Sequence, residues 1–223
     1  MKTVLITGAN RGIGLALAKH FTGRGDTVIA ACRSSSEALE ATGAQVESGV
    51  DVTDDNALAA LVERLGDTRV DMLVLNAGIL GREALGEIDG AGFDSMRQQF
   101  EVNALGPLRV AQVLMDNLAD DAKVGIITSR MGSVADNGSG GGYGYRASKA
   151  AVNAIGKSLA VDLAPRGISV FLLHPGYVAT DMVGGSGDIS PEQAAERLVE
   201  RLDTLTLEQT GTFWHANGDS LPW

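Results

Sequence analysis

The sequence has almost no cysteine. Cys32 is the single one among 223 residues, so no intrachain disulfide can form. Disulfide frameworks are typical of small secreted proteins, whereas their absence suits the reducing cytosol. The sequence therefore predicts a cytoplasmic protein and excludes a disulfide-stabilised secreted scaffold.

Long apolar runs are absent as well. The first one stops at Gly8, which makes it too short for a membrane span or for the apolar core of a signal peptide. Positive charge is in the minority, since 18 Lys and Arg face 28 Asp and Glu, for a formal net charge of −10. Because nucleic-acid phosphates and anionic lipids both attract basic surfaces, neither nucleic acid nor a membrane is expected as a partner.

Metal-ligand spacing is the third absence. His20, His174 and His215 are far apart, and none has a cysteine partner at ligand spacing. Zinc sites in proteins are commonly built from closely spaced Cys and His pairs. The sequence therefore predicts no metal site.

What the sequence does contain is an alternation of strand-like and helical segments. Apolar, β-branched runs predict strands over residues 3–7, 26–32, 71–78, 123–129 and 168–176, with weaker candidates at 44–48 and 211–216. Helical spacing predicts helices over 14–25, 53–66 and 146–167. Continuous apolar strands are typical of a parallel sheet covered on both faces. We predict an α/β fold, a three-layer Rossmann-type doubly wound parallel sheet of about seven strands with helices on both faces, built as one domain from residues 1–223.

A glycine-rich turn separates the first strand from the first helix. The stretch "TGANRGIG" contains Gly8, Gly12 and Gly14, and the other candidate cofactor contacts between them are Asn10, Arg11 and Ile13. Glycine lets a pyrophosphate approach the backbone, and a helix N-terminus offers unpaired N–H groups. The spacing G-x-x-x-G-x-G differs from G-x-G-x-x-G, and no P-loop lysine follows. A strand–turn–helix unit favours dinucleotide binding over a glycine turn without a ligand.

The end of the second strand bears on which dinucleotide is bound. An acid at this point would hold the ribose 2′-hydroxyl of NAD. Here Cys32 takes that position and Arg33 follows it. With no carboxylate to repel a 2′-phosphate, Arg33 and Arg11 could pair with it, although each arginine alone could be a solvated surface charge. The pattern favours NADP(H) over NAD(H).

Seven segments occur in the order and at the spacing of one family. They are "TGANRGIG" (7–14), "DVTD" (51–54), "LNAG" (75–78), "EVNALGP" (101–107), "ITSRMGS" (127–133), "YRASK" (145–149) and "HPGYVATDM" (174–182). With these segments the chain resembles the short-chain dehydrogenase/reductase (SDR) family over nearly its whole length. The chain length and the ending "GTFWHANGDSLPW" are similar to the C-factor-like and sniffer-like subgroup, many of whose members are described as NADPH-dependent carbonyl reductases.

The resemblance implies further cofactor contacts. Asp51 and Val52 are expected to contact the adenine, and three residues of the cofactor cleft follow the third strong strand: Asn76, Ala77 and Gly78. The nicotinamide carboxamide is expected to be held by Pro175, Gly176, Val178 and Thr180. Taken singly, Asp51 could be a helix cap and residues 76–78 an ordinary turn. Family members often associate through their long helix, which implies a possible homodimer or homotetramer.

A carbonyl that accepts a hydride needs a proton donor, because negative charge develops on its oxygen. Tyr145 and Lys149 are four residues apart at the start of a predicted helix, so both lie on one face. A neighbouring ammonium lowers the pKa of a phenol, which makes Tyr145 the expected acid. Tyr143 has an alanine four residues on and is expected to pack or to form a pocket wall. By the resemblance, Lys149 also contacts the nicotinamide ribose.

Two more polar residues complete the expected catalytic set. Ser129 directly follows a predicted strand, where ligands gather in open α/β sheets, and by the resemblance it hydrogen-bonds the substrate oxygen. Ser133 is a competitor, because it is nearer to Tyr145 in the sequence. By the resemblance, Asn103 holds a water that links Lys149 to solvent. A helical asparagine could instead lie on the surface or kink the helix.

The substrate contacts are expected in loops, with Met131, Tyr143, Tyr177 and Met182 forming an apolar wall and the segment near 182–190 helping to set the substrate. We predict a reversible, NADPH-dependent reduction of small-molecule aldehydes and ketones to alcohols. Two alternatives are a C-factor-like signalling or regulatory dinucleotide-binding protein and an alcohol dehydrogenase that acts mainly in oxidation.

Overall fold

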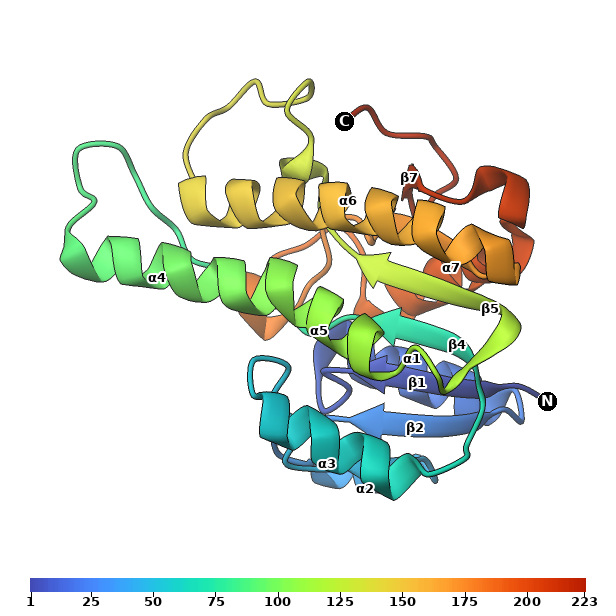
Figure 1. Cartoon of the computed structure of the whole chain (residues 1–223). Helices are drawn as coiled ribbons and strands as arrows, with labels where there is room; N and C mark the ends of the chain where they lie inside the picture. Colours follow the sequence, from blue (N-terminus) through green and yellow to red (C-terminus); the bar gives the residue numbers. More distant parts are fainter.

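A computed structural model describes residues 1–223, and its centre is one parallel sheet of seven strands (Figure 1). The strands are β1 (Thr3–Thr7), β2 (Thr27–Ala31), β3 (Gln45–Glu47), β4 (Val70–Leu75), β5 (Leu118–Ile127), β6 (Ser169–His174) and β7 (Thr212–His215). Their order in the sheet is β3-β2-β1-β4-β5-β6-β7. The predicted doubly wound sheet is confirmed, including both weak candidates at its edges.

Helices cover both faces of the sheet. They are α1 (Gly12–Gly23), α2 (Glu37–Glu40), α3 (Asp55–Leu65), α4 (Gly90–Phe100), α5 (Gly106–Val113), α6 (Tyr143–Leu163) and α7 (Pro191–Thr204). Helices α1 and α7 pack together, whereas α4 packs against α6 and α3 against α5. A π-helical turn, η1 (Glu101–Leu105), joins α4 to α5. The sequence predicted three of these helices and placed the start of α6 at residue 146, three residues too late.

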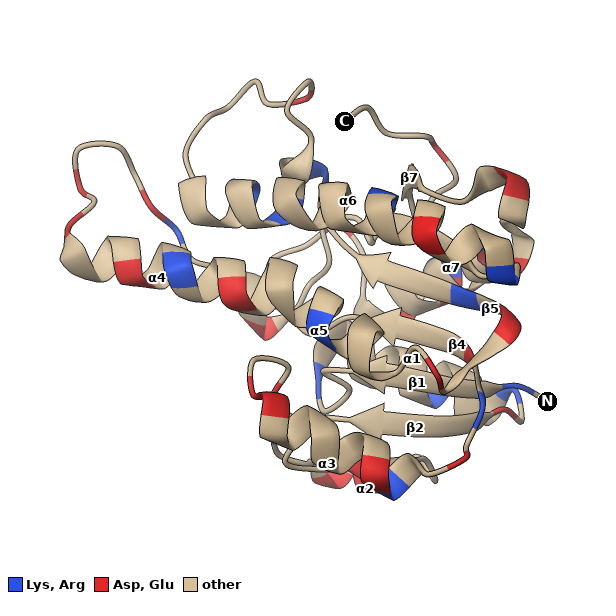
Figure 2. Cartoon of the chain, viewed as in Figure 1, with Lys and Arg blue, Asp and Glu red and all other residues tan.

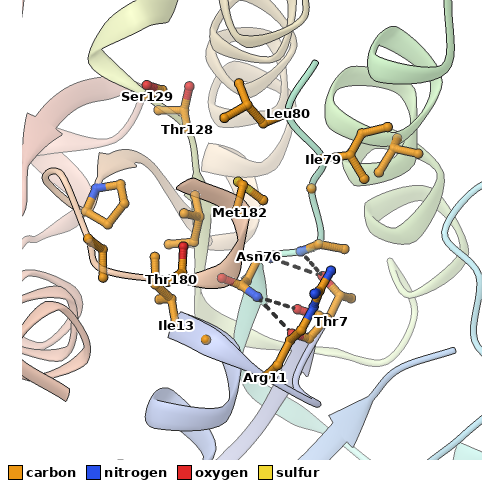
Figure 3. Close-up of a pocket in the computed structure, with 18 of the residues that line it drawn as sticks. Thr7, Arg11, Ile13, Asn76, Ile79, Leu80, Thr128, Ser129, Thr180 and Met182 are labelled. Carbon is orange, nitrogen blue, oxygen red and sulfur yellow. Dashed lines mark hydrogen bonds between the residues drawn. The ribbon is translucent and has the colours of Figure 1, made fainter. Parts of the chain in front are cut away.

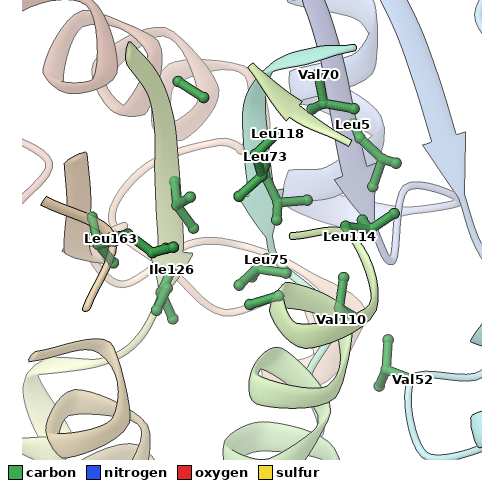
Figure 4. Close-up of a cluster of buried hydrophobic side chains, with 14 of the residues drawn as sticks. Leu5, Val52, Val70, Leu73, Leu75, Val110, Leu114, Leu118, Ile126 and Leu163 are labelled. Carbon is green, nitrogen blue, oxygen red and sulfur yellow. The ribbon is translucent and has the colours of Figure 1, made fainter. Parts of the chain in front are cut away.

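Strand side chains alternate between two separate cores. On β1, Leu5 belongs to the cluster under α3, α5 and α6, whereas Val4 and Ile6 belong to the cluster under α1 and α7. This alternation follows from the two-residue period of a strand. Figure 4 shows the first cluster, in which Leu73 and Ile126 of neighbouring strands lie between the helices. Apolar contact on both faces explains why the strands read as continuous apolar runs.

Charged residues are largely kept out of the strands (Figure 2). One exception is Lys123 on β5, whose Nζ donates to the carbonyl oxygens of Leu202 and Leu205 at 2.7 Å each and so fixes the end of α7. Burial lowers the pKa of this lysine. None of the helices is both long and apolar enough to span a membrane.

Some helices begin with a side-chain cap on their first N–H groups, and others begin without one. Asp54 caps α3 by accepting from the backbone N–H of Asn56 at 2.9 Å, and Ser190 forms a capping box on α7. Helices α1 and α6 receive no side-chain cap from their own N-cap residues, Arg11 and Gly142. Both ends lie at the carboxyl edge of the sheet, where the chain order reverses between β1 and β4.

Candidate active site

A cavity of about 700 Å³ lies at the carboxyl ends of the strands. Eight segments contribute lining residues: parts of 7–13, 31–33, 50–52, 76–80, 127–131 and 174–183, Gln98 with Val102, and Tyr145 with Lys149 at the start of α6. Figure 3 shows that side chains from the first turn, from the segment after β4 and from residues 180–182 face one another across it. The cavity thus occupies the switch point where ligands bind in open α/β sheets.

The glycine turn forms the floor of this cavity. A Cβ at Gly8 would lie 2.9 Å from the Cα of Ala77, so no side chain fits there, and Gly8 adopts a φ of +68°. Gly14 has a different role from the expected one. It does not line the cavity, and a Cβ at Gly14 would lie 2.2 Å from the carbonyl oxygen of Gly8. Gly14 therefore packs α1 against the turn, and the contacts open to a ligand are Gly8, Asn10, Arg11, Gly12 and Ile13.

Asn76 locks this turn to the end of β4 (Figure 3). Its Nδ2 donates to the carbonyl oxygens of Thr7 at 3.0 Å and Gly8 at 3.1 Å. The Oγ1 of Thr7 accepts in return from the N–H groups of Asn76 at 3.0 Å and Ala77 at 3.2 Å. The side chain of Asn76 thus bonds within the protein, where it holds the glycine turn in shape.

The end of β2 presents no negative charge to the cavity. Cys32 is buried there, and burial, aided by the charge of Glu40, raises the pKa of its thiol and keeps it neutral. Arg33 follows on the exposed rim. Arg11 lies across the mouth, 3.7 Å from the carboxylate of Asp181 in an ion pair whose side chains are 66% and 82% exposed. Both arginines therefore remain available to an anion, because an exposed pair is weak.

Asp51 and Val52 line the same end of the cavity. The Oδ1 of Asp51 accepts from the backbone N–H of Thr53 at 2.9 Å and from its Oγ1 at 2.7 Å. Burial works to raise the pKa of Asp51, but these hydrogen bonds and the charge of Arg33 outweigh it and hold the pKa below its usual value. Asp51 is thus an ionised acceptor beside the cavity.

Tyr145, Lys149 and Ser129 come together at the other end. Tyr145 and Lys149 lie in the first two turns of α6, with the Nζ of Lys149 5.7 Å from the tyrosine ring centroid. The hydroxyl of Ser129 lies near the phenol of Tyr145 and acts to lower its pKa. The Nζ of Lys149 donates to the carbonyl oxygen of Ile127 at 2.9 Å. A phenol, a hydroxyl and an amine thus share one wall of the cavity.

The expected effect of Lys149 on the tyrosine is wrong for this structure. Burial raises the pKa of Tyr145, and only the nearby hydroxyl of Ser129 opposes the rise. Burial also lowers the pKa of Lys149 from 10.5 to about 8. At a pH high enough to ionise Tyr145, Lys149 has lost its proton, so it exerts no attraction on the phenolate. The phenol therefore stays protonated throughout the neutral range.

The two candidate serines lie in different surroundings. Ser129 follows β5, lines the cavity and accepts from the N–H of Met131 at 3.1 Å. Ser133 does not line the cavity; its Oγ donates to the carbonyl oxygen of Trp223 at 3.2 Å and accepts from the N–H of Asp136 at 3.1 Å. Of the two, Ser129 is therefore the one placed to meet a substrate.

Asn103 lies behind the cavity wall, in the π-helical turn η1. It is fully buried, and its Oδ1 accepts from the N–H of Ile79 at 2.8 Å. Its Nδ2 donates to the carbonyl oxygen of Ile79 at 2.8 Å and to the Oγ of Ser148 at 3.1 Å. Both amide hydrogens are thus used within the protein, and the side chain fixes the segment that follows β4.

The sequence and the fold agree with one family. A family model described as short chain dehydrogenase matches residues 2–191. The chain belongs to the short-chain dehydrogenase family. The resemblance drawn from the seven motifs is thereby confirmed.

Two named relatives are similar over most of their length. The 1-hydroxy-2-glutathionyl-2-methyl-3-butene dehydrogenase of Rhodococcus sp. (strain AD45) is 44% identical over 229 residues, which cover 100% of both chains. C-signal of Myxococcus xanthus is 42% identical over 157 residues, covering 69% of this chain and 93% of C-signal.

Two solved structures are similar over the whole chain. Carbonyl reductase Sniffer of D. melanogaster has a TM-score of 0.88 at 27% identity and covers 100% of both chains. A carbonyl reductase from Pseudomonas aeruginosa PAO1, solved in complex with NADP, has a TM-score of 0.85 at 33% identity, again over 100% of both chains. The similar proteins thus include C-signal and the carbonyl reductase Sniffer.

In this short-chain dehydrogenase, the end of β6 and the segment after it contribute residues 174–178 and 180–183 to the cavity wall. Its expected nicotinamide contacts all line the cavity: Pro175, Gly176, Val178 and Thr180. Met131, Tyr177 and Met182 also line it, but Tyr143 does not. Tyr143 is the first residue of α6 and is 38% exposed, so the pocket-wall role suggested for it is wrong.

Several lining residues of the short-chain dehydrogenase cavity were not found from the sequence: Thr7, Ile79, Leu80, Gln98, Val102, Thr128, Arg130, His174, Asp181 and Val183. Gln98 and Val102 are four residues apart, a spacing that would have pointed to a shared helical face had α4 been recognised. His174 ends β6 and packs edge-on against His215, with ring centroids 4.8 Å apart. Burial, with the charges of His215 and Arg130, lowers the pKa of His174 to about 3, so it remains a neutral imidazole.

Proposed function

We propose that this protein is an NADP(H)-dependent oxidoreductase that reduces small aldehydes and ketones to alcohols, reversibly, with Tyr145 as the proton donor. The observation that carries the proposal is the presence of Ser129, Tyr145 and the buried Lys149 together in the wall of one cavity. These three groups lie at the end of the cavity opposite to Arg33 and Asp51.

The chain's own residues fit a phosphorylated dinucleotide. The N-terminus of α1 has no side-chain cap, so its first N–H groups are free for a pyrophosphate, and Gly8 and Gly12 leave room beside them. At the far end Asp51 accepts hydrogen bonds, while Arg33 and Arg11 would attract a 2′-phosphate. When bound, a reduced nicotinamide supplies the hydride. Residues 174–180 and Lys149 would hold its carboxamide and ribose.

Each reactive side chain has a task that its surroundings support. The raised pKa of Tyr145 keeps the phenol protonated, as a general acid in reduction requires. The hydroxyl of Ser129 donates a hydrogen bond to the substrate oxygen and stabilises the negative charge that develops there. Lys149 is the cation nearest to that charge below its pKa of about 8. Asn103 supports the proton relay by fixing Ile79 and Ser148 around Lys149.

The substrate end favours a compact, mostly apolar carbonyl compound. Its walls contain Ile79, Leu80, Val102, Met131 and Met182. Met182 belongs to the proposed substrate loop, near 182–190, which begins in a short 3₁₀ turn and is tied back by the bridge between Val178 and Ile189. We place all of these functions in one domain, because every strand belongs to the same sheet.

The test is turnover of an aldehyde and ketone panel with NADPH and with NADH. We expect NADPH consumption with several members of the panel, and a Tyr145→Phe variant that binds NADPH but loses at least about a hundredfold in kcat. Tyr143→Phe is the matched control and should keep wild-type activity. Full activity of Tyr145→Phe would overturn the assignment of the acid, and a clear preference for NADH would overturn the role of Arg33.

Two observations favour alternative readings of the same site. The Rhodococcus relative is named as a dehydrogenase, which favours the oxidation of an alcohol in the reverse direction. Alcohol-dependent reduction of NADP⁺ that is faster than carbonyl reduction would support that reading. The similarity to C-signal favours a signalling or regulatory protein that binds a dinucleotide. NADPH binding without turnover on any substrate of the panel would support that second reading.

A further inference from the structure

Helix α6 carries Tyr145 and Lys149, yet it begins without a cap of its own. Its N-cap residue is Gly142, in the left-handed region with φ 57° and ψ 44°, and glycine has no side chain to accept a hydrogen bond. The first N–H groups of any helix need an acceptor from outside the helix. Tyr145 is the third residue of α6, so a loose first turn would loosen the phenol.

The missing acceptor comes from the loop after β4. The carboxylate of Glu83 is buried, with 8% of the residue exposed, and its Oε2 accepts from the N–H of Gly144 at 3.1 Å. The backbone carbonyl oxygen of Glu83 accepts from the N–H of Gly142 at 3.0 Å. No lysine or arginine forms an ion pair with Glu83, although a buried carboxylate normally needs one. The positive end of the α6 dipole takes that place.

The second oxygen of Glu83 is engaged as well. Its Oε1 accepts from the Nε2 of Gln99 at 2.6 Å, and Ser95 Oγ lies 3.5 Å away. Gln99 is buried in α4 and uses its own Oε1 to accept from the N–H of Gly81 at 2.8 Å. Each oxygen of Glu83 therefore accepts from at least one donor. Only a carboxylate accepts at both, because an amide offers one acceptor and one donor.

The packing around this cluster leaves no spare room. A Cβ at Gly81 would lie 2.2 Å from the Nε2 of Gln99 and 2.5 Å from the Oε1 of Glu83. A Cβ at Gly144 would lie 2.7 Å from the Nε2 of Gln99. The loop, α4 and α6 thus meet at two glycines, and the polar groups of Glu83 and Gln99 fill the junction. The same loop lines the cavity through Ile79 and Leu80.

From this junction we propose that Glu83 is the N-terminal cap of α6, supplied from 61 residues away, and that it positions Tyr145 for proton transfer. The proposal rests on the proposed function, because it assigns to Glu83 the placement of the proposed acid. Glu83 is a positioning residue, acting through the first turn of α6. The hydrogen bond that Glu83 accepts from Gln99 also fixes the cavity-lining loop relative to that turn.

The test exchanges the side chains of Glu83 and Gln99. Glu83→Gln leaves one donor without an acceptor, and we expect about a tenfold loss of kcat, with the NADPH dissociation constant and the substrate KM changed by less than about twofold. The double variant E83Q/Q99E restores a complementary set, because the new amide donates to the new carboxylate and accepts from Gly144. We expect it to recover kcat to within about threefold of wild type. Glu87→Gln, an exposed residue of the same loop, is the matched control.

A second measurement does not depend on activity. Amide hydrogen exchange at Gly144 should become at least about tenfold faster in Glu83→Gln, recover in the double variant and stay unchanged in Glu87→Gln. If the wild-type protein turns over no compound of the panel, the proposed function is wrong. The amide exchange rates at Gly144 would still decide whether Glu83 caps α6. If Glu83→Gln does not fold, recovery of folding and of kcat in the double variant supports the proposal. Wild-type kcat in Glu83→Gln, or no recovery in the double variant, would overturn it.

Discussion

Lys149 is a buried cation with little to balance its charge. Only 4% of the residue is exposed, and its Nζ makes one hydrogen bond, to the carbonyl oxygen of Ile127. The resulting fall of its pKa to about 8 means that the protonated form is disfavoured in the folded protein. Replacing Lys149 by methionine keeps an unbranched side chain of similar length and removes the charge. We therefore predict a pH-dependent difference in stability between wild type and Lys149→Met.

The sign follows from proton binding in the two states. Below about pH 8 both states carry the proton, and the folded protein bears the whole cost of the buried charge. Above the ordinary pKa of 10.5 neither state carries it. In between, the unfolded chain binds more protons, so the stability of wild type rises with pH. The difference between the pKa of Lys149 in the unfolded and folded states corresponds to about 3 kcal/mol of unfolding free energy. About 2 kcal/mol of this is regained between about pH 7 and about pH 9.5.

The assay is urea denaturation of the protein without added cofactor at about pH 7 and about pH 9.5. Relative to Lys149→Met, wild type should gain about 2 kcal/mol of unfolding free energy at the higher pH. Lys157→Met, which changes an exposed lysine of the same helix, should show no such change. If the difference between wild type and Lys149→Met is equal at both pH values, burial does not disfavour the charged form and the reasoning is wrong.

Three further predictions concern named contacts of the cavity. Arg33→Ala should lower kcat/KM for NADPH by about 10- to 100-fold, with little change for NADH, as steady-state assays with both cofactors would reveal. Ser129→Ala should lower kcat by about a hundredfold, while Ser133→Ala should lower mainly the melting temperature; the opposite result would favour Ser133 as the substrate contact. Gly14→Ala should destabilise the protein by about 3 kcal/mol or more, because the new Cβ would meet the carbonyl oxygen of Gly8 at 2.2 Å. A variant that unfolds at the same urea concentration as wild type would contradict this.

The sheet could be predicted from the sequence because both its faces are covered. Every strand then appears as an apolar run, and even the three-residue β3 left a signal at 44–48. The grouping of Ser129, Tyr145 and Lys149 at one cavity could also be predicted, since Ser129 follows a strand directly and Tyr145 and Lys149 share a helical face. Helices α2, α4, α5 and α7 were not predicted. Helix α4 has a single buried residue, Gln99, so its apolar pattern is weak.

Other features depend on contacts between distant segments. The pKa of Tyr145 is decided by burial, which no local spacing reports, and so its direction was predicted wrongly. The pairing of Glu83 with Gly144 spans 61 residues and leaves no motif. Tyr143 differs from Tyr145 by two positions only, but the helix turns it out of the cavity, to 38% exposure. Such properties come from tertiary packing, whereas the motifs describe single loops.

The loop that precedes Tyr145 constrains how this site can be varied. Gly140, Gly141 and Gly142 have φ values of 65°, 63° and 57°, so three consecutive residues have left-handed backbone. Space is not the obstacle at Gly140, where a Cβ would meet nothing within 4 Å. The obstacle is chirality, because each L-residue costs roughly 1–2 kcal/mol in this conformation. A combinatorial library over residues 140–142 would therefore lose folded members at each position, whereas D-alanine introduced there by chemical synthesis has the chirality that favours this backbone.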